Sequence, residues 1–187
     1  MRMIRSALIA LIGLAAAATP SLAASDRPYA GMEQRPVKAL SDEDLGDLRA
    51  GRGMGLALPA ELNGLPGPRH VLDLADRLDL SAGQRAAMQR MFDEMREAAI
   101  TLGRHVIDRE AALDRLFAAS THDEAAMRSL IAEIAALRGD LRFIHLRYHL
   151  LARDALTPEQ IALYRQARGY GGAAPAPAGH TPGAHPH

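Results

Sequence analysis

Two histidines in the stretch "HLRYH" have the spacing of a metal-binding pair. His145 and His149 are four residues apart, so on a helix both imidazoles lie on one face. If this helix pairs with the preceding one through a turn near Ser120, His145 faces Met95 and His149 faces Met91. Two imidazole and two thioether ligands would suit copper better than magnesium or calcium. Methionine at helical spacing is also typical of core packing, and that interpretation stays open.

Further histidines lie in residues 171–187, which read "GGAAPAPAGHTPGAHPH". A tract of Gly, Ala and Pro has too few apolar side chains to form a core, so we expect a disordered tail. His180, His185 and His187 can bind zinc, nickel or copper loosely, because neutral imidazole is available near neutral pH. No pattern in the chain requires a cofactor.

The sequence lacks the patterns that indicate an enzyme. It has no cysteine, no G-x-S-x-G, no H-E-x-x-H and no phosphate-binding loop after a predicted strand. Acidic pairs such as Asp93–Glu94 are consecutive, so their carboxylates point in different directions on a helix. We therefore expect no catalytic residues.

Two long helices must position the histidines. Apolar residues recur at gaps of three, four and seven over residues 82–118, and again from about residue 121 to 155. Thr121 is the expected N-cap of the second helix. Each helix is about 50 Å long at 1.5 Å per residue, and the short connection forces them to pair antiparallel. The fold class is therefore all-α, with a long helical hairpin and shorter flanking helices.

The second long helix has apolar residues on more than one side. Phe143, Leu146 and Leu150 point away from the stripe that includes Leu141 and Tyr148. A helix that is apolar nearly all round is buried on two sides. One side meets the first long helix, and the other meets the N-terminal helix, the last helix or a second protomer. We expect a homodimer.

The hairpin is bracketed by two similar helix starts, "LSAGQ" and "LTPEQ". In each, a Ser or Thr N-cap and a Gln three residues later form a capping box, and the preceding Leu can pack on the next turn. Proline at the first helical position loses no hydrogen bond. The residues concerned are Leu80, Ser81, Gln84, Leu156, Thr157, Pro158 and Gln160.

This arrangement resembles the Spy/CpxP family of periplasmic proteins. "LTPEQ" fits the LTxxQ signature of that family fully, and "LSAGQ" fits it with Ser for Thr. The resemblance covers about residues 68–170. It implies an all-helical fold that dimerises into a curved cradle, in a family of ATP-independent chaperones and of relatives that sense or buffer heavy metals and restrain envelope-stress signalling.

Basic residues follow one flank of the second long helix. Arg138, Arg142 and Arg153 have helical spacing with His145 and His149. Beside the apolar residues Phe143, Leu146 and Leu150, such a stripe suits a flexible client polypeptide. The alternative is a solvated face that acidic residues of the first helix partly neutralise.

The chain is organised as four segments. Residues 1–23 have a basic start, a short apolar run and a small-x-small end, which predicts a cleaved signal peptide of the Gram-negative type and a periplasmic location. Residues 24–67 are rich in Gly and Pro and contain one short helix, with Ser41 as N-cap and Gly51 as its end. We expect this segment to wrap the hairpin as a belt. Residues 68–170 form the hairpin domain, and residues 171–187 the tail.

The charge of the processed chain argues against nucleic acid as a partner. The full chain has 22 basic and 22 acidic residues. Loss of Arg2 and Arg5 with the signal peptide leaves 20 basic and 22 acidic residues, a net charge of −2. No membrane span is expected after processing. We expect a Spy/CpxP-type chaperone or stress-response protein that binds unfolded periplasmic proteins or an envelope sensor protein. The alternatives are a zinc, copper or nickel sensor or buffer of the same fold, and a non-catalytic helical scaffold.

Overall fold

The computed structural model describes residues 27–119 and 123–170 of the 187-residue chain. Within these ranges the chain is helical and contains no strand, which confirms the predicted fold class. The elements are η1 (Met32–Gln34), α1 (Asp42–Ala50), α2 (Leu58–Glu61), α3 (Pro68–Asp73), α4 (Ala82–Ala118), α5 (Glu124–Asp154) and α6 (Pro158–Ala167). The predicted signal peptide and the histidine-containing tail lie outside the described residues.

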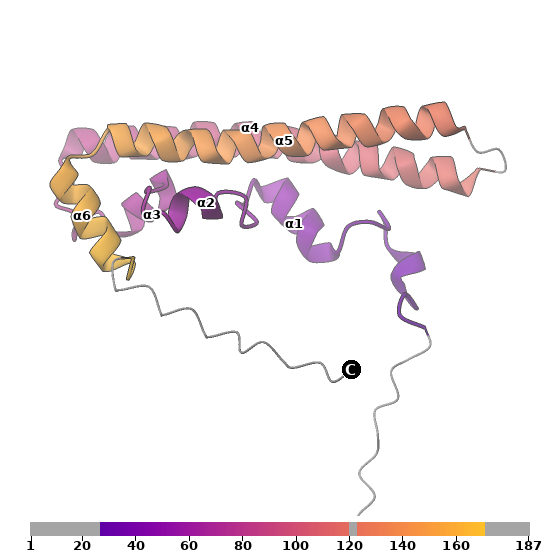
Figure 1. Ribbon diagram of the computed structural model, residues 1–187, viewed down its shortest axis with the longest axis horizontal. Helices are drawn as coiled ribbons and strands as arrows, with labels where there is room; N and C mark the ends of the chain where they lie inside the picture. Colours follow the sequence, from indigo (N-terminus) through magenta and orange to yellow (C-terminus); the bar gives the residue numbers. More distant parts are fainter. Residues whose placement is uncertain (1–26, 120–122, 171–187) are drawn as a thin grey trace, which may run out of the picture.

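Helices α4 and α5 form the long antiparallel hairpin that the sequence predicts (Figure 1). At 37 and 31 residues they are about 55 and 46 Å long at 1.5 Å per residue. The N-cap of α5 is Asp123 rather than Thr121, which lies outside the described residues. The Asp123 carboxylate accepts hydrogen bonds from the backbone N–H groups of Ala125 and Ala126, and its charge suits the positive end of the helix.

The second buried side of α5 differs from the one that we expected. His145 and His149 are buried beside Tyr148, whereas Phe143 and Leu150 are 60% and 46% exposed. Neither the N-terminal helix nor the last helix covers Phe143 and Leu150, so that part of the expectation is wrong. A second protomer on this outer face of α5 stays a prediction.

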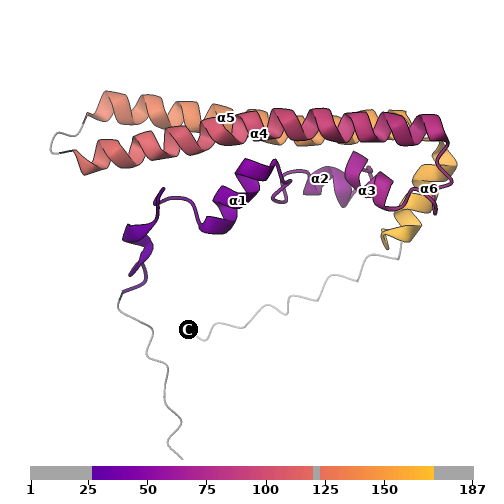
Figure 2. The same ribbon diagram turned by 180° about the vertical axis from the view of Figure 1, so that it is seen from behind.

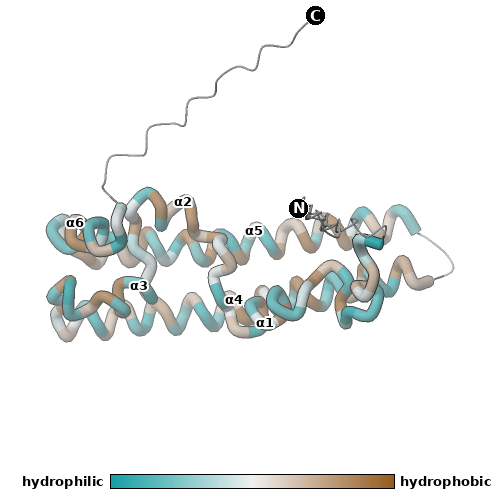
Figure 3. Tube along the Cα trace, turned by 90° about the horizontal axis from the view of Figure 1, so that it is seen from below, coloured by the Kyte–Doolittle hydropathy of each residue, from teal (hydrophilic) through white to brown (hydrophobic). Residues whose placement is uncertain are grey.

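The segment before α3 lies along one side of the hairpin (Figure 2). We call residues 37–67 the belt. Helix α1 contacts α4 and α2 contacts α5, so the belt crosses from one helix of the hairpin to the other (Figure 3). Ser41 caps α1 and Gly51 ends it, as predicted. Besides α1, residues 24–67 contain η1 before the belt and the single turn α2 within it.

Two apolar clusters attach the shorter elements to the hairpin. One lies at its open end, where α3 and α6 pack on the start of α4 and the end of α5. The other lies under α1, midway along the hairpin. Their buried members are Val71, Ala75, Leu78, Leu80, Met88, Ala152, Leu156 and Tyr164 in the first, and Val37, Leu40, Leu45, Leu48, Ala99, Val106 and Leu141 in the second.

The two predicted helix starts meet at the open end of the hairpin. Both capping boxes form as expected. The side-chain amides of Gln84 and Gln160 then bind each other, with N···O distances of 2.8 and 3.1 Å. Gln84 also donates to the carbonyl oxygen of Ala155 at 3.1 Å, and Gln160 to that of Leu78 at 3.2 Å. Each amide thus uses both its N–H groups and both lone pairs of its oxygen.

We predict that Gln84 and Gln160 are strongly coupled. Replacing either with Met leaves the other amide with two unmade hydrogen bonds in a largely buried place, at a cost of about 1–3 kcal/mol of unfolding free energy. The double substitution leaves no unpaired amide and should cost less than the sum of the two single changes. Urea unfolding of the four proteins measures the coupling. The control is Gln89→Met, because the Gln89 amide contacts Asp93 on the exposed side of α4. Additive changes in unfolding free energy at positions 84 and 160 would contradict the prediction.

Candidate functional site

A cavity of about 540 Å³ lies between the belt and the hairpin. Its roof is the glycine-rich loop after α1 together with α2, and its floor is formed by both long helices. The residues that matter for its chemistry are Glu61, His70, Phe92, Met95, Arg96, His145 and His149. It is a pocket of largely apolar walls with a few polar groups, which is the usual composition of a binding site.

His145 lines this cavity with a ring nitrogen that has no hydrogen-bond partner among the described residues. The residue is only 3% exposed, and the nitrogen concerned is the buried Nε2. Burial lowers the pKa of His145 below its ordinary value of 6.5, and the charge of His149 adds to this effect. The ring is therefore neutral at neutral pH, and each of its nitrogens can act as a donor or as a lone-pair acceptor.

His149 is held in place by the end of the belt. Its Nδ1 lies 2.8 Å from the carbonyl oxygen of Leu65, and this contact requires the proton to be on Nδ1. In the neutral ring Nε2 then carries a free lone pair, and this atom lies beneath Gly67. A Cβ atom at Gly67 would lie 2.7 Å from Nε2, so only glycine permits this approach. Burial lowers the pKa of His149, although the bond to Leu65 and the charge of Glu61 oppose that change.

A buried carboxylate joins the belt to the last helix. Glu61 is 5% exposed and accepts hydrogen bonds from Tyr164 at 2.5 Å, Tyr170 at 3.1 Å, Arg168 at 3.2 Å and His70 at 3.1 Å. These four donors come from α3, from α6 and from the residues just after it. We call Glu61 with its four donors the Glu61 cluster. It fastens α2 to the open end of the hairpin through charge-assisted bonds.

The Glu61 cluster strongly favours the ionised carboxylate. Burial alone would raise the pKa of Glu61, but the hydrogen bonds from His70, Tyr164 and Tyr170 outweigh it and lower the pKa from 4.5 to about 2. Burial and the contact with Glu61 raise the pKa of Tyr164. The Tyr164 hydroxyl therefore stays protonated, as a hydrogen-bond donor, at neutral pH and well above it.

The structure brings together three of the four residues predicted as metal ligands in the hairpin. His145, His149 and Met95 line the cavity, whereas Met91 packs against the apolar cluster at the open end. In residues 27–119 and 123–170, no three or more His, Cys, Asp or Glu side chains are grouped closely enough to hold a metal ion. His180, His185 and His187 lie outside the described residues. Metal binding stays a prediction.

The predicted basic flank of α5 is interrupted. His145 and His149 are buried, Arg138 pairs with Glu110 at 2.8 Å, and Arg153 pairs with Asp154 at 2.6 Å. Arg142 is exposed. The flank is therefore not a continuous basic surface, because part of it faces the belt and part of it is neutralised.

The comparison with protein families decides the relationship of the chain. Residues 68–168 match the model of the LTXXQ motif family. The chain belongs to the LTXXQ motif family. This family includes the Spy/CpxP-type proteins, so the resemblance inferred from the two motif copies is confirmed. Comparison with curated proteins and with solved structures finds no match.

Membership of the LTXXQ family sets the broad class of this protein. Proteins of the family are typically periplasmic and generally non-enzymatic. None of the helices in the described ranges is long and apolar enough to cross a membrane. The match begins at residue 68, where the belt ends, so the Glu61 cluster and the cavity combine family elements with a segment outside the matched region.

Sequence reasoning missed the Glu61 cluster. Glu61 is the only charged residue in the mainly apolar stretch "LALPAELNGLPG", and this isolated acid was the available signal. Three of its four donors gave no such signal, because Tyr164, Arg168 and Tyr170 are about a hundred residues away in sequence.

We predict that the Glu61 cluster gives stability that acid removes. Because the folded pKa of about 2 is below the ordinary 4.5, this contribution is complete above pH 4.5 and is lost as pH falls from 4.5 to 2. The shift corresponds to roughly 3 kcal/mol of unfolding free energy. Urea unfolding from pH 7 to 2 should show this loss in the wild type and not in Glu61→Gln. The exposed Glu43→Gln is the control, and equal slopes for all three proteins would refute the assignment.

Proposed function

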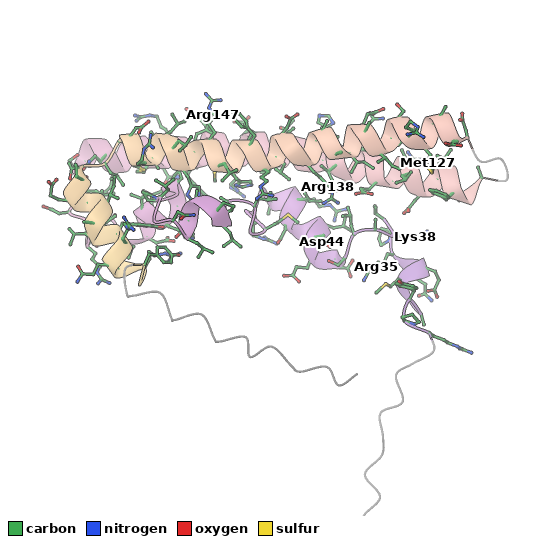
Figure 4. All side chains as sticks on the ribbon, in the orientation of Figure 1. Arg35, Lys38, Asp44, Met127, Arg138 and Arg147 are labelled. Atoms are coloured by element: carbon green, nitrogen blue, oxygen red, sulfur yellow. The ribbon has the colours of Figure 1, made fainter. Side chains whose placement is uncertain are left out.

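We propose that this LTXXQ family protein is a periplasmic, ATP-independent chaperone or stress-response protein of the Spy/CpxP type. It binds unfolded or partner polypeptides without catalysis. The observation that supports this most directly is the outer face of α5, where Phe143 and Leu150 are exposed on a rigid helix about 46 Å long. Arg147 points away from the belt (Figure 4). It lies four residues after Phe143 and three before Leu150, so helical spacing places it on the same face of α5. Apolar and cationic groups together suit a flexible chain with apolar and acidic segments.

Several features of the chain fit this proposal. The predicted signal peptide directs it to the periplasm, where ATP is absent, and a hairpin needs no nucleotide to present its faces. Weak net charge means that clients are held by local apolar contacts more than by long-range attraction. The exposed face also suits a second copy, and a homodimer forms part of the proposal.

We predict that Phe143→Ser with Leu150→Ser weakens client binding several-fold. The wild type at stoichiometric ratio should slow the aggregation of an unfolded client, as followed by light scattering, and the double variant should need several times more protein for the same effect. The control is Leu62→Ser with Leu163→Ser, which removes exposed leucines from the belt and α6.

Size-exclusion chromatography with light scattering separates client binding from self-association at the same residues. A variant that becomes monomeric but still protects clients would assign Phe143 and Leu150 to the dimer. A wild-type protein that protects no client would contradict the proposed function.

The cavity supports a second candidate function, a heavy-metal sensor or buffer. His145 offers an unpartnered Nε2, His149 offers a lone pair on Nε2, and Met95 lines the same space. Two imidazoles and a thioether form a soft donor set that suits copper, zinc or nickel. The three arginines around the cavity, Arg52, Arg69 and Arg96, oppose the entry of cations.

We predict that any specific metal binding depends on His145 and His149 and not on the tail. Calorimetric titration with zinc, nickel and copper should give micromolar or tighter binding that survives truncation after Tyr170 and disappears in His145→Ala with His149→Ala. His105→Ala, an exposed histidine on α4, is the control, and circular dichroism checks the fold. Binding that is lost with the tail would make the metal incidental to the hairpin.

A further inference from the structure

The belt is attached to the hairpin at two separate places. At its start, Leu45 and Leu48 of α1 are each 3% exposed and pack in the cluster with Ala99, Val106 and Leu141. At its end, the Glu61 cluster and the bond from His149 to Leu65 fasten it to the open end of the hairpin. Between the two attachments lies the cavity of about 540 Å³. The middle of the belt therefore spans a space that it does not fill.

The contact between α1 and α4 has the character of a bound peptide. The backbones approach so closely that a Cβ atom at Gly103 would lie 2.3 Å from the carbonyl oxygen of Leu48. Arg96 donates through Nε to the carbonyl oxygen of Ala50 at 3.2 Å, near the free carbonyls at the end of α1. A glycine for close approach, an apolar groove and a cation at the helix end together recognise a short helix.

The start of α1 complements the opposite end of this groove. Its first turn carries Asp42, Glu43 and Asp44. Arg138, which also pairs with Glu110 at 2.8 Å, extends from α5 toward α1 and Asp44 (Figure 4). The charge of Arg138 contributes to lowering the pKa of Asp44, after the larger effect of the hydrogen bonds from Ser41. The apolar cluster, the arginine at the end of α1 and the charge near its start thus all suit the same kind of ligand, a short helix with an acidic first turn.

Helix α1 depends on the hairpin for its own structure. It has nine residues, and isolated helices shorter than about twelve residues are marginal in water. Release of α1 therefore turns it into a flexible segment. The region that matches the family begins at residue 68, so the hairpin is common to the family and the belt lies outside the match.

We propose that α1 is a displaceable internal ligand and that the surface beneath it is a second docking site for polypeptides. This site consists of Arg96, Ala99, Gly103, Val106, Arg138 and Leu141, and we call it the inner face. Its partner is a helical segment with an acidic first turn, two apolar side chains three residues apart and a small residue at its end. The proposal goes beyond the proposed function, which places clients on the outer face of α5, but it rests on the same capacity to bind polypeptides.

Two sets of substitutions in the full chain test the proposal, one in helix α1 of the belt and one in the inner face. Leu45→Ser with Leu48→Ser removes the anchors of α1 and leaves the inner face intact. Gly103→Ala also displaces α1, but its methyl group blocks any other helix from the same approach. Both variants should show at least tenfold faster hydrogen exchange in residues 42–50 with the long helices retained. Gly139→Ala is the control for Gly103→Ala, since a Cβ atom there meets nothing within 4 Å, and Leu58→Ser with Leu62→Ser is the control for the belt change.

The binding probe is a synthetic peptide of residues 37–55 with a fluorescent label. It should bind Leu45→Ser/Leu48→Ser at least tenfold more tightly than the wild type, and Gly103→Ala no more tightly than the wild type. An equal gain in peptide affinity in both variants would place the peptide elsewhere and overturn the proposal. Release of α1 without any gain in peptide affinity would also overturn it. So would a failure of both variants to release α1. Client aggregation is measured in parallel. If the peptide binds tightly but no variant protects a client, the proposed function is contradicted and the inner face is still a docking site.

Discussion

The amide pair of Gln84 and Gln160 is the contact on which the arrangement of the helices depends. A long antiparallel hairpin is closed by its loop at one end only, and its open end needs a separate link. Each amide makes four hydrogen bonds: two with the other amide, one to a turn carbonyl, that of Ala155 or Leu78, and one from the backbone N–H of its own N-cap residue. A shift of one helix against the other would leave both amides unpaired, so the pair fixes the register of α4, α5 and α6.

Local chemistry explains what could be predicted from the sequence. The starts of α4 and α6 were predicted correctly because a capping box involves residues only three positions apart. The start of α5 was placed two residues early, because Thr121 and Asp123 are both good N-caps and the sequence does not rank them. The meeting of the two motif glutamines was not predicted, although both were singled out, since capping explains each of them fully without the other.

The positions of His145 and His149 show where sequence reasoning fails. Their spacing correctly placed both imidazoles on one side of α5, and the hairpin register correctly placed Met95 near them. Their assignment to a solvent-facing basic flank was wrong, because the belt covers that side. Outside α1 the belt has no helical or strand periodicity, so the sequence did not say which side of α5 it covers. The Glu61 cluster was missed for the same reason.

The belt changes what the hairpin can offer to a partner. Without it, a hairpin of this kind exposes both of its faces along the whole length. With it, the outer face of α5 keeps exposed Phe143 and Leu150, while the inner face is occupied by α1 and the glycine-rich loop lines one side of the cavity. The two attachments differ in kind, since α1 is held by apolar packing that any similar helix can replace, and α2 by a buried carboxylate with four donors that no simple peptide reproduces. Exchange at the first attachment can therefore proceed while the second keeps the belt in place.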